Sequence, residues 1–350
     1  METIHWSVDI NVEKQKGYPQ ISEAADCLRN GHVVAFPTET VYGLGADATS
    51  DQAVQGIFDA KGRPSDNPLI VHISDTDELS GLVAEVSSTA SKLMETFWPG
   101  PLTIIFNKKS GVFSDLVTAG LETIGIRMPD HPVALELIRR SGKPLAAPSA
   151  NTSGKPSPTA AAHVAGDLSG RIAGIVDGGE TGVGLESTVI DCTVTPPMIL
   201  RPGGVSAEDI AACIGEVTTD PSLKKEQSAP RSPGMKYTHY APTAPLYLLE
   251  GETEWIQKTV HRLQQEGKKV GLLASRELAA EVNADVISVC GSRNNPAATA
   301  RSLYHAIRSF NETDVDIILA ESFDENGIGT AIMNRLEKAA GHKWIRQRSS

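Results

Sequence analysis

A break in the folding pattern between residues 218 and 245 constrains this chain more than any other feature. Before the break, helix-like and strand-like segments alternate, and after it a second alternation begins. The segment itself, TTDPSLKKEQSAPRSPGMKYTHYAPTAP, carries five prolines and no apolar period. It is predicted to be a semi-rigid linker. We therefore expect two domains, 1–217 and 246–350, joined by a proline-rich linker at 218–245.

The first domain is predicted to be an α/β fold. Its apolar runs are typical of buried strands: HVVAF, LIVHI, LTIIF, IGIRM, LAAPS, GIVDGG, STVIDC and MILRP. Several of these runs follow one another with no helix between them, which favours a mixed sheet. A capping-box pair, Thr49 and Gln52, predicts a helix through about Ala60 that ends at Gly62. Further helices are expected at 87–97, 132–141 and 158–168, the last with Ser157 as its N-cap.

The second domain is predicted to be a smaller, Rossmann-like α/β fold. Four strand-like runs, LYLL, KVGLLA, DVISVC and VDIILA, are separated by helical stretches near 252–266, 296–310 and 329–340. About 100 residues are enough for such a domain.

Composition limits the classes of function. The net charge of −11 argues against broad nucleic-acid binding, which needs a basic face. The first residues lack the apolar region of a signal peptide, and no run approaches the ~18 apolar residues of a membrane span. The four cysteines form no CxxC pair. We therefore expect reduced thiols and a cytoplasmic protein.

Polar loops at strand ends carry most of the candidate site residues. KGRPSDNPLIVH gives Lys61, Arg63, Asn67 and His72; taken singly, cation capping of a helix and a core histidine explain them. Arg127, between Ile126 and Met128 on a strand, is equally compatible with a ligand site and with a buried salt bridge. The remaining candidates are compatible with ordinary loops and turns: Ser149, Asn151, Ser153, Ser157, Ser187 and Arg201.

Taken together, these loops point to an anion site. Lys61, Arg63, Arg127 and Arg201 all fall near strand ends of one domain, beside hydroxyls and glycines. Cations and exposed backbone N–H groups are what phosphates and carboxylates require. The sequence has no G-x-x-x-x-G-K-[ST], no HExxH and no G-x-S-x-G, and it shows no tight metal cluster. The chemistry indicated is positioning of anions, without a protein nucleophile.

At these residues the sequence resembles the YrdC-type threonylcarbamoyl-AMP synthases in their longer, two-domain form. The matching stretches cover nearly the whole chain in the expected order: PTETVYGLG, KGRPSDNPL, GIRMPDHP, APSANTSG, GLESTVID, RPGG, SPGMKYTHYAP and GIGTAIMNRLEKAA. The resemblance implies a YrdC-like twisted mixed sheet with helices as the first domain. It also implies synthesis of threonylcarbamoyl-AMP and pyrophosphate from L-threonine, bicarbonate and ATP, with Mg²⁺ accompanying ATP.

The resemblance also assigns roles to residues. Threonine would be bound by Thr40, His72, Arg127, Ala147 and Ser187. ATP would be bound by Arg63, Asn67, Thr123, Ser149, Ser157, Arg201 and Tyr240. Lys61, Arg63 and Arg127 would supply the charge that catalysis needs. The glycines of PTETVYGLG would let the backbone approach the ligand closely.

Beyond the site, the resemblance implies a place in tRNA modification. The product would supply the threonylcarbamoyl group for the adenosine beside the anticodon, through a downstream tRNA threonylcarbamoyl-transfer complex, and this chain itself would not bind tRNA tightly. Because carbamates decompose in water, the linker, with Lys236, Tyr237, His239 and Tyr240, is predicted to act as a lid.

Two other readings of the same residues remain open at this point. One is an RNA-binding or ribosome-maturation factor that uses the cavity for a phosphate backbone. Against it stand the charge of −11 and an aromatic content of only 5%, which is low for base stacking. The other is a non-catalytic nucleotide-binding regulator.

Overall fold

The computed structural model describes residues 2–9, 18–221 and 239–347. Contacts divide the described residues into two compact units. The first unit comprises 2–153, 158–182 and 186–221, and the second comprises 154–157, 183–185 and 239–347. Most of the predicted linker, 222–238, lies outside the described residues. The lid and the boundaries at 217 and 245 therefore stay predictions.

The first unit is built on one mixed sheet. Within the described residues it has eleven strands in the order β1-β8-β2-β3-β7-β4-β6-β5-β9-β10-β11. Parallel pairs such as β4–β6 and β5–β9 alternate with antiparallel pairs such as β5–β6 and β9–β10. The strands are β1 (Ile4–Ser7), β2 (Val34–Phe36), β3 (Gly43–Asp47), β4 (Ile70–His72), β5 (Leu102–Asn107), β6 (Thr123–Arg127), β7 (Leu145–Ala146), β8 (Gly174–Asp177), β9 (Thr188–Asp191), β10 (Met198–Arg201) and β11 (Thr218–Thr219).

The predicted mixed sheet is confirmed, with three additional strands. The patterns missed β1, β3 and β11. β11 pairs with β10 inside the range predicted as linker. β3 was missed because its residues are Gly-rich and buried on both faces, so they show no alternation.

The helices described in the first unit are α1 (Gln20–Arg29), α2 (Asp51–Lys61), α3 (Leu79–Leu82), α4 (Ser88–Phe97), α5 (Asp115–Thr118), α6 (Pro132–Ser141), α7 (Ala161–Leu168) and α8 (Ala207–Ile214), with a 3₁₀ turn at Thr76–Glu78. The four helices expected in the first unit are present as α2, α4, α6 and α7, and the described residues hold further helices that were not predicted, among them α3, α5 and α8. α2 ends at Gly62, as expected from its left-handed φ of 61°.

Two predicted helix starts were wrong. The N-cap of α2 is Ser50, whose side chain accepts from the Ala53 N–H, while the Thr49 hydroxyl donates instead to Asp47. α7 begins at Ala161 and not at Pro158. The Pro158 carbonyl accepts from the Tyr42 N–H, and this tertiary contact holds the residue in the loop.

Alternation along the strands gives the sheet two different faces. Val71, Ile104 and Ile126 belong to the main core, whereas Ile70 and Ile105 belong to a small cluster with Val189 and Leu200. Successive side chains of a strand point to opposite faces. His72 therefore shares the second face with Ile70, and Arg127 shares it with Thr123. The face that carries the small cluster is also the face that carries the candidate site.

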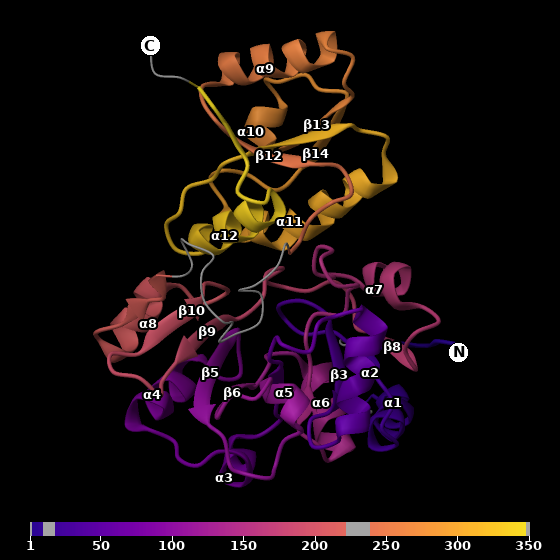
Figure 1. Ribbon diagram of the computed structural model, residues 1–350, viewed down its shortest axis with the longest axis vertical. Helices are drawn as coiled ribbons and strands as arrows, with labels where there is room; N and C mark the ends of the chain where they lie inside the picture. The colour runs from indigo at the N-terminus through magenta and orange to yellow at the C-terminus, as the bar shows by residue number, and fades with distance from the viewer. Residues whose placement is uncertain (1, 10–17, 222–238, 348–350) are drawn as a thin grey trace. The chain divides into compact units, whose positions relative to one another are not determined.

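The second unit is a five-stranded parallel sheet, which confirms the Rossmann-like prediction. Its strand order is β14-β13-β15-β12-β16. Figure 1 shows α9 and α10 on one face of this sheet and α11 and α12 on the other. The elements are β12 (Leu246–Glu250), α9 (Thr253–Gln265), β13 (Val270–Ala274), α10 (Arg276–Ala279), β14 (Val286–Val289), α11 (Pro296–Ser309), a 3₁₀ turn (Phe310–Glu312), β15 (Ile317–Glu321), α12 (Gly329–Ala339) and β16 (Trp344–Arg346). The patterns missed β16.

No helix among the described residues is long and apolar enough to span a membrane.

Candidate functional site

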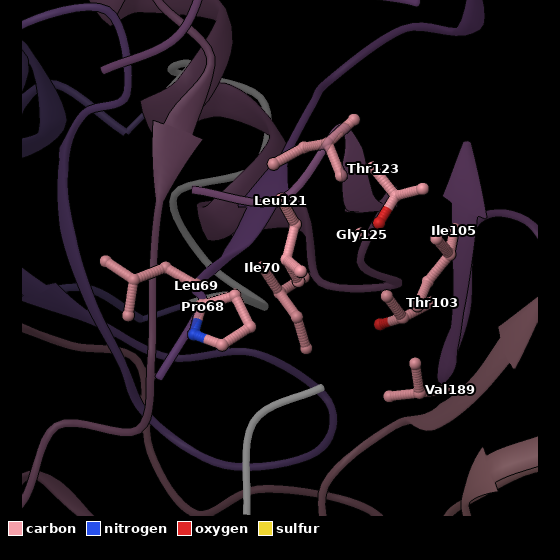
Figure 2. A pocket seen from close by; sticks show the side chains of 10 residues that line it. Pro68, Leu69, Ile70, Thr103, Ile105, Leu121, Thr123, Gly125 and Val189 are labelled. Atoms are coloured by element: carbon pink, nitrogen blue, oxygen red, sulfur yellow. The ribbon is translucent and has the colours of Figure 1, made fainter. Parts of the chain in front are cut away.

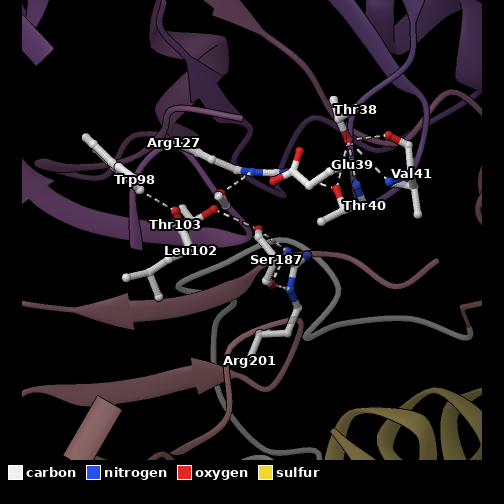
Figure 3. A network of polar contacts seen from close by, with 11 residues as sticks. Thr38, Glu39, Thr40, Val41, Trp98, Leu102, Thr103, Arg127, Ser187 and Arg201 are labelled. Atoms are coloured by element: carbon white, nitrogen blue, oxygen red, sulfur yellow. Dashed lines mark hydrogen bonds and ion pairs between the residues drawn. The ribbon is translucent and has the colours of Figure 1, made fainter. Parts of the chain in front are cut away.

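Arg127, at the end of β6, is the centre of a buried polar cluster. Its side chain is 4% exposed and lies between two loops. Nη1 donates to the Thr40 hydroxyl at 2.9 Å, and Nε donates to the Gly100 carbonyl at 3.2 Å. Nη2 lies 2.5 Å from a carboxylate oxygen of Glu39. Figure 3 shows the guanidinium held between the loop of Glu39 and Thr40 and the segment that leads into β5.

A second buried arginine, Arg201, sits at the end of β10. It donates to the Ser187 carbonyl from Nε and Nη2, and Nη2 also reaches the Ser187 hydroxyl at 3.1 Å. That hydroxyl in turn lies 2.8 Å from the Thr103 hydroxyl (Figure 3). A Cβ at Gly203 would come within 2.3 Å of the Ser187 backbone, so only glycine permits this approach. The structure thus brings together Ser187, a predicted threonine ligand, and Arg201, a predicted ATP ligand.

His72 lies beside Arg127 in the sheet. The two residues are register partners across the parallel pair β4–β6. Burial, and then the nearby Arg127 cation, lower the pKa of His72 to about 3, so the imidazole is neutral at pH 7. Its Nδ1 has no hydrogen-bond partner within the described residues. A neutral imidazole with an open nitrogen is suited to accept from, or donate to, a bound ligand.

Lys61 is buried and shapes the loop after β7. Its ammonium donates to the carbonyls of Ser149 and Asn151, at 2.5 and 2.7 Å. Ala147 begins the same loop, and its N–H donates to the Ile70 carbonyl at 2.9 Å. Lys61 therefore fixes the backbone that presents Ser149, an arrangement that the sequence did not reveal.

Arg63 and Asn67 occupy the loop between α2 and β4. Arg63 Nη2 approaches the carbonyls of Asn67 and Pro68 at 3.4 Å. Asn67 is buried, and its side-chain oxygen has no hydrogen-bond partner among the described residues. The loop thus presents a cation next to an amide oxygen that is left for a ligand.

Thr123 borders an apolar slot on the same face of the sheet. Figure 2 shows it with Thr103, Gly125, Ile70 and Val189 around a shallow pocket. A Cβ at Gly125 would lie 3.2 Å from the Thr103 methyl, so a larger side chain at this position would crowd the pocket. The pocket has room for only about one water molecule, and the Thr103 and Thr123 hydroxyls belong to its lining.

Two predicted ATP-binding residues, Ser157 and Tyr240, belong to the second unit. Ser157 is buried. The ring of Tyr240 packs 5.3 Å from that of Tyr304, and the Arg335 guanidinium lies 5.6 Å from its centroid. Lys236 and Tyr237 of the predicted lid lie outside the described residues.

The expectation that the glycines of PTETVYGLG let the backbone approach a ligand stays a prediction. Gly43 and Gly45 lie in β3, and a Cβ at Gly45 would come within 2.7 Å of the Phe36 ring. The missing side chains make room for that ring in the core.

Sequence reasoning also missed Glu39, Thr103 and His131. Glu39 stands inside the quoted PTET motif, and a carboxylate between two buried threonines was an available signal. Burial lowers the pKa of His131 to about 4, despite the opposing effect of Glu39. Across the described residues, no group of three or more His, Cys, Asp or Glu could hold a metal ion.

The fold and the site together indicate the general class of protein. One sheet face collects two buried arginines, a neutral histidine, hydroxyls and an apolar slot, and several of its buried polar atoms have no hydrogen-bond partner among the described residues. This is an α/β protein that binds anionic small molecules.

Comparisons with known proteins define the family. The Sua5/YciO/YrdC family, described as "Telomere recombination", matches residues 26–203. The threonylcarbamoyl-AMP synthase C-terminal domain matches residues 205–341. The chain therefore belongs to the threonylcarbamoyl-AMP synthase family, in its two-domain form.

Full-length relatives agree with this assignment. The chain is 56% identical over 346 residues to the threonylcarbamoyl-AMP synthase of Bacillus subtilis, covering 99% of this chain and 100% of that protein. It is 47% identical over 345 residues to that of Pyrococcus abyssi, covering 97% and 99%. The crystal structure of P. abyssi Sua5 complexed with L-threonine has a TM-score of 0.93 at 46% identity, covering 99% and 100%.

Proposed function

We propose that this protein joins L-threonine, bicarbonate and ATP into threonylcarbamoyl-AMP, with release of pyrophosphate and water. The observation that carries the proposal is the single face of the first unit on which Arg127, His72 and Thr40 lie near the Ser187–Arg201 pair. Full-length relatives named for this activity, and a relative bound to L-threonine, support it.

Threonine is held at the Arg127 cluster. Arg127 binds its carboxylate, since a guanidinium presents donors in the fork that a carboxylate matches. Thr40 and Ser187 offer hydroxyls, His72 offers a neutral imidazole, and Ala147 lies beside them at the end of β7. The threonine nitrogen then takes up a carboxyl group from bicarbonate and becomes a carbamate.

ATP is held by the surrounding loops. The base lies against the slot at Thr123, and Arg63, Asn67, Ser149 and Arg201 hold the ribose and phosphates. Ser157 and Tyr240 stay predicted ATP-binding residues. Lys61 contributes by fixing the loop of Ser149, to which it donates. Mg²⁺ enters with ATP, bound through phosphate oxygens.

The reaction then needs alignment more than protein nucleophiles. A carbamate oxygen attacks the α-phosphorus, the bond to the bridging oxygen breaks, and pyrophosphate leaves with its electron pair. Because the substrate carries the nucleophile, the protein contributes orientation and charge stabilisation by Arg63, Arg127 and Arg201.

The product is a mixed anhydride, which a downstream tRNA threonylcarbamoyl-transfer complex consumes at the adenosine beside the anticodon. This chain does not itself hold tRNA tightly, consistent with its charge of −11. We place the protein in the cytoplasm, where its four free cysteines stay reduced.

Release of pyrophosphate tests the proposal. Purified protein with MgATP should release pyrophosphate only when both threonine and bicarbonate are present. Release that continues after either is omitted would contradict the proposed function.

A further inference from the structure

The reaction requires a proton acceptor that none of the roles above supplies. Threonine is a zwitterion at neutral pH, and its ammonium nitrogen has no free electron pair. It cannot attack the carbon of bicarbonate or CO₂ until a proton has been removed. The residue that removes it must lie beside the group that binds the threonine carboxylate, because both groups are attached to the same carbon.

Glu39 lies at that place. Its side chain is 12% exposed, and Oε1 lies 2.5 Å from Arg127 Nη2. Oε1 is thus ion-paired with the guanidinium, while Oε2 has no hydrogen-bond partner within the described residues. Buried carboxylates are normally hydrogen-bonded, since an unmet one costs stability. Figure 3 shows the Glu39 carboxylate against the end of the guanidinium, next to Thr40.

The pair is complementary to an α-amino acid. A guanidinium receives the carboxylate, and a neighbouring carboxylate receives the ammonium. The two imidazoles nearby are weak proton acceptors, because burial lowers the pKa of His72 to about 3 and that of His131 to about 4. Glu39 is therefore the group at the Arg127 cluster that combines negative charge with unused acceptor positions.

We propose that Glu39 is a catalytic residue that binds the ammonium of threonine and removes its proton; this inference rests on the proposed function. An N–H bond breaks and an O–H bond forms on Glu39, which leaves a neutral amine. Glu39 passes this proton to the hydroxyl of bicarbonate, which leaves as water and yields CO₂. The amine electron pair then forms the N–C bond, and the second proton passes through Glu39 to solvent. The products are the carbamate, water and one proton.

The two directions of the reaction separate this role from a structural one. Synthesis from threonine needs the ammonium proton removed. Pyrophosphorolysis of threonylcarbamoyl-AMP, which returns ATP and the carbamate, does not. Glu39→Gln keeps the shape of the side chain but cannot take up the proton. Glu122→Gln, at a carboxylate that is 90% exposed, is the matched control.

At saturating threonine and pH 7, Glu39→Gln should lower the rate of synthesis by about 100-fold or more. Pyrophosphorolysis should stay within a few-fold of wild type. Raising the pH should recover synthesis in the variant, by about tenfold per unit, because more free threonine then carries a neutral amine. Glu122→Gln should match wild type in both directions.

Two results would overturn the proposal: unchanged synthesis in Glu39→Gln, or equal losses in both directions at every pH, which would mark a structural role. Glu39→Ala provides a second test, in which added formate should restore synthesis and chloride should not. Failure of both anions to restore it would count against Glu39 as a base. Failure of the proposed function would appear instead in the wild-type protein, which would form no threonylcarbamoyl-AMP.

Discussion

Each unit of this protein buries a glutamate beside an arginine, but the two pairs differ in what surrounds them. In the second unit, Glu321 at the end of β15 accepts from the Ser275 N–H at 2.6 Å and from Arg293 Nε at 2.5 Å. In the first unit, Glu39 Oε1 is ion-paired with Arg127 Nη2, and Oε2 accepts no hydrogen bond within the described residues. Both carboxylates are shielded from water, at 5% and 12% exposed.

The difference distinguishes a buried ion pair with a structural role from one that can bind a ligand. Hydrogen bonds to both oxygens of Glu321 offset the cost of removing the charge from water, so this carboxylate needs no further partner at the end of β15. The pair of Glu39 and Arg127 keeps donor and acceptor positions open, and a substrate with both charges completes it. The open acceptor position on Glu39, beside a buried cation, therefore supports the first unit as the site of the chemistry.

The largest effect is expected at Arg127. Arg127→Ala should lower the affinity for threonine about 10- to 100-fold and the affinity for ATP much less. The reason is that a hydrogen bond to a charged group contributes roughly 1.5–3 kcal/mol. Titration calorimetry with each ligand measures the split. The control is Arg139→Ala, at a side chain that is 64% exposed on α6. Equal, small losses for both ligands would refute the assignment of Arg127.

The opposite split is expected for Arg201→Ala and Arg63→Ala. Each substitution should weaken ATP binding about 10-fold or more and leave threonine affinity nearly unchanged. The reason is that the hydrogen-bond donors removed are those proposed to bind the phosphates. The same calorimetric titrations measure this. A threonine affinity that falls as much as ATP affinity would show that the two groups of residues do not divide the ligands.

Glu321→Gln should change stability without changing binding. Loss of the charge-assisted bonds should lower the free energy of unfolding by about 1.5–3 kcal/mol. Urea unfolding measures this, with Glu250→Gln at an exposed ion pair as the control. Threonine affinity should match wild type. A weakened threonine affinity would remove the contrast with Glu39.

His72 should make the protein less stable in acid. Unfolded histidine binds a proton near pH 6.5, while the folded pKa of His72 is about 3. Between these values the unfolded state holds more protons, so stability falls as pH drops below 6.5, by at most about 1.4 kcal/mol per pH unit for this group. In His72→Asn, the free energy of unfolding should therefore depend less on pH between pH 7 and 5. His261→Asn, at an exposed position, should leave the slope unchanged. An unaltered slope in His72→Asn would contradict a neutral, buried His72.

The smallest effect is expected at the slot. Thr123→Val keeps the shape of the side chain and removes one hydroxyl, so ATP affinity should fall about 2- to 10-fold, the range of a neutral hydrogen bond. Calorimetry with ATP measures this. An unchanged affinity would place the base elsewhere.

Local patterns predicted much of the fold because local physics sets it. The faces of α6 and α9 and the apolar runs of β4, β5 and β6 follow directly from periodicity. The start of α7 could not be read in this way, since a hydrogen bond from the distant Tyr42 holds Pro158 in the loop. β16 is short and partly exposed, so its residues carry no strong alternation.

The site was predictable in residue type but not in pairing. Polar residues at strand ends indicated an anion site, and Arg127 was open between a ligand role and a buried salt bridge. The structure gives it an ion pair with Glu39, and the substrate proposed for this site would use the same charges. From sequence, Lys61 was compatible with capping a helix or with an anion site, and only the fold brings the carbonyls of Ser149 and Asn151 to it. Such long-range pairs depend on strand order, which no local pattern records.

The most direct test of the central claim is the fate of the bicarbonate carbon. Mass spectrometry of the product formed from MgATP, L-threonine and ¹³C-bicarbonate should show threonylcarbamoyl-AMP that carries the label. An unlabelled threonyl adenylate, or AMP with no threonine attached, would contradict the claim that this face of the sheet assembles a carbamate and transfers it to the α-phosphate.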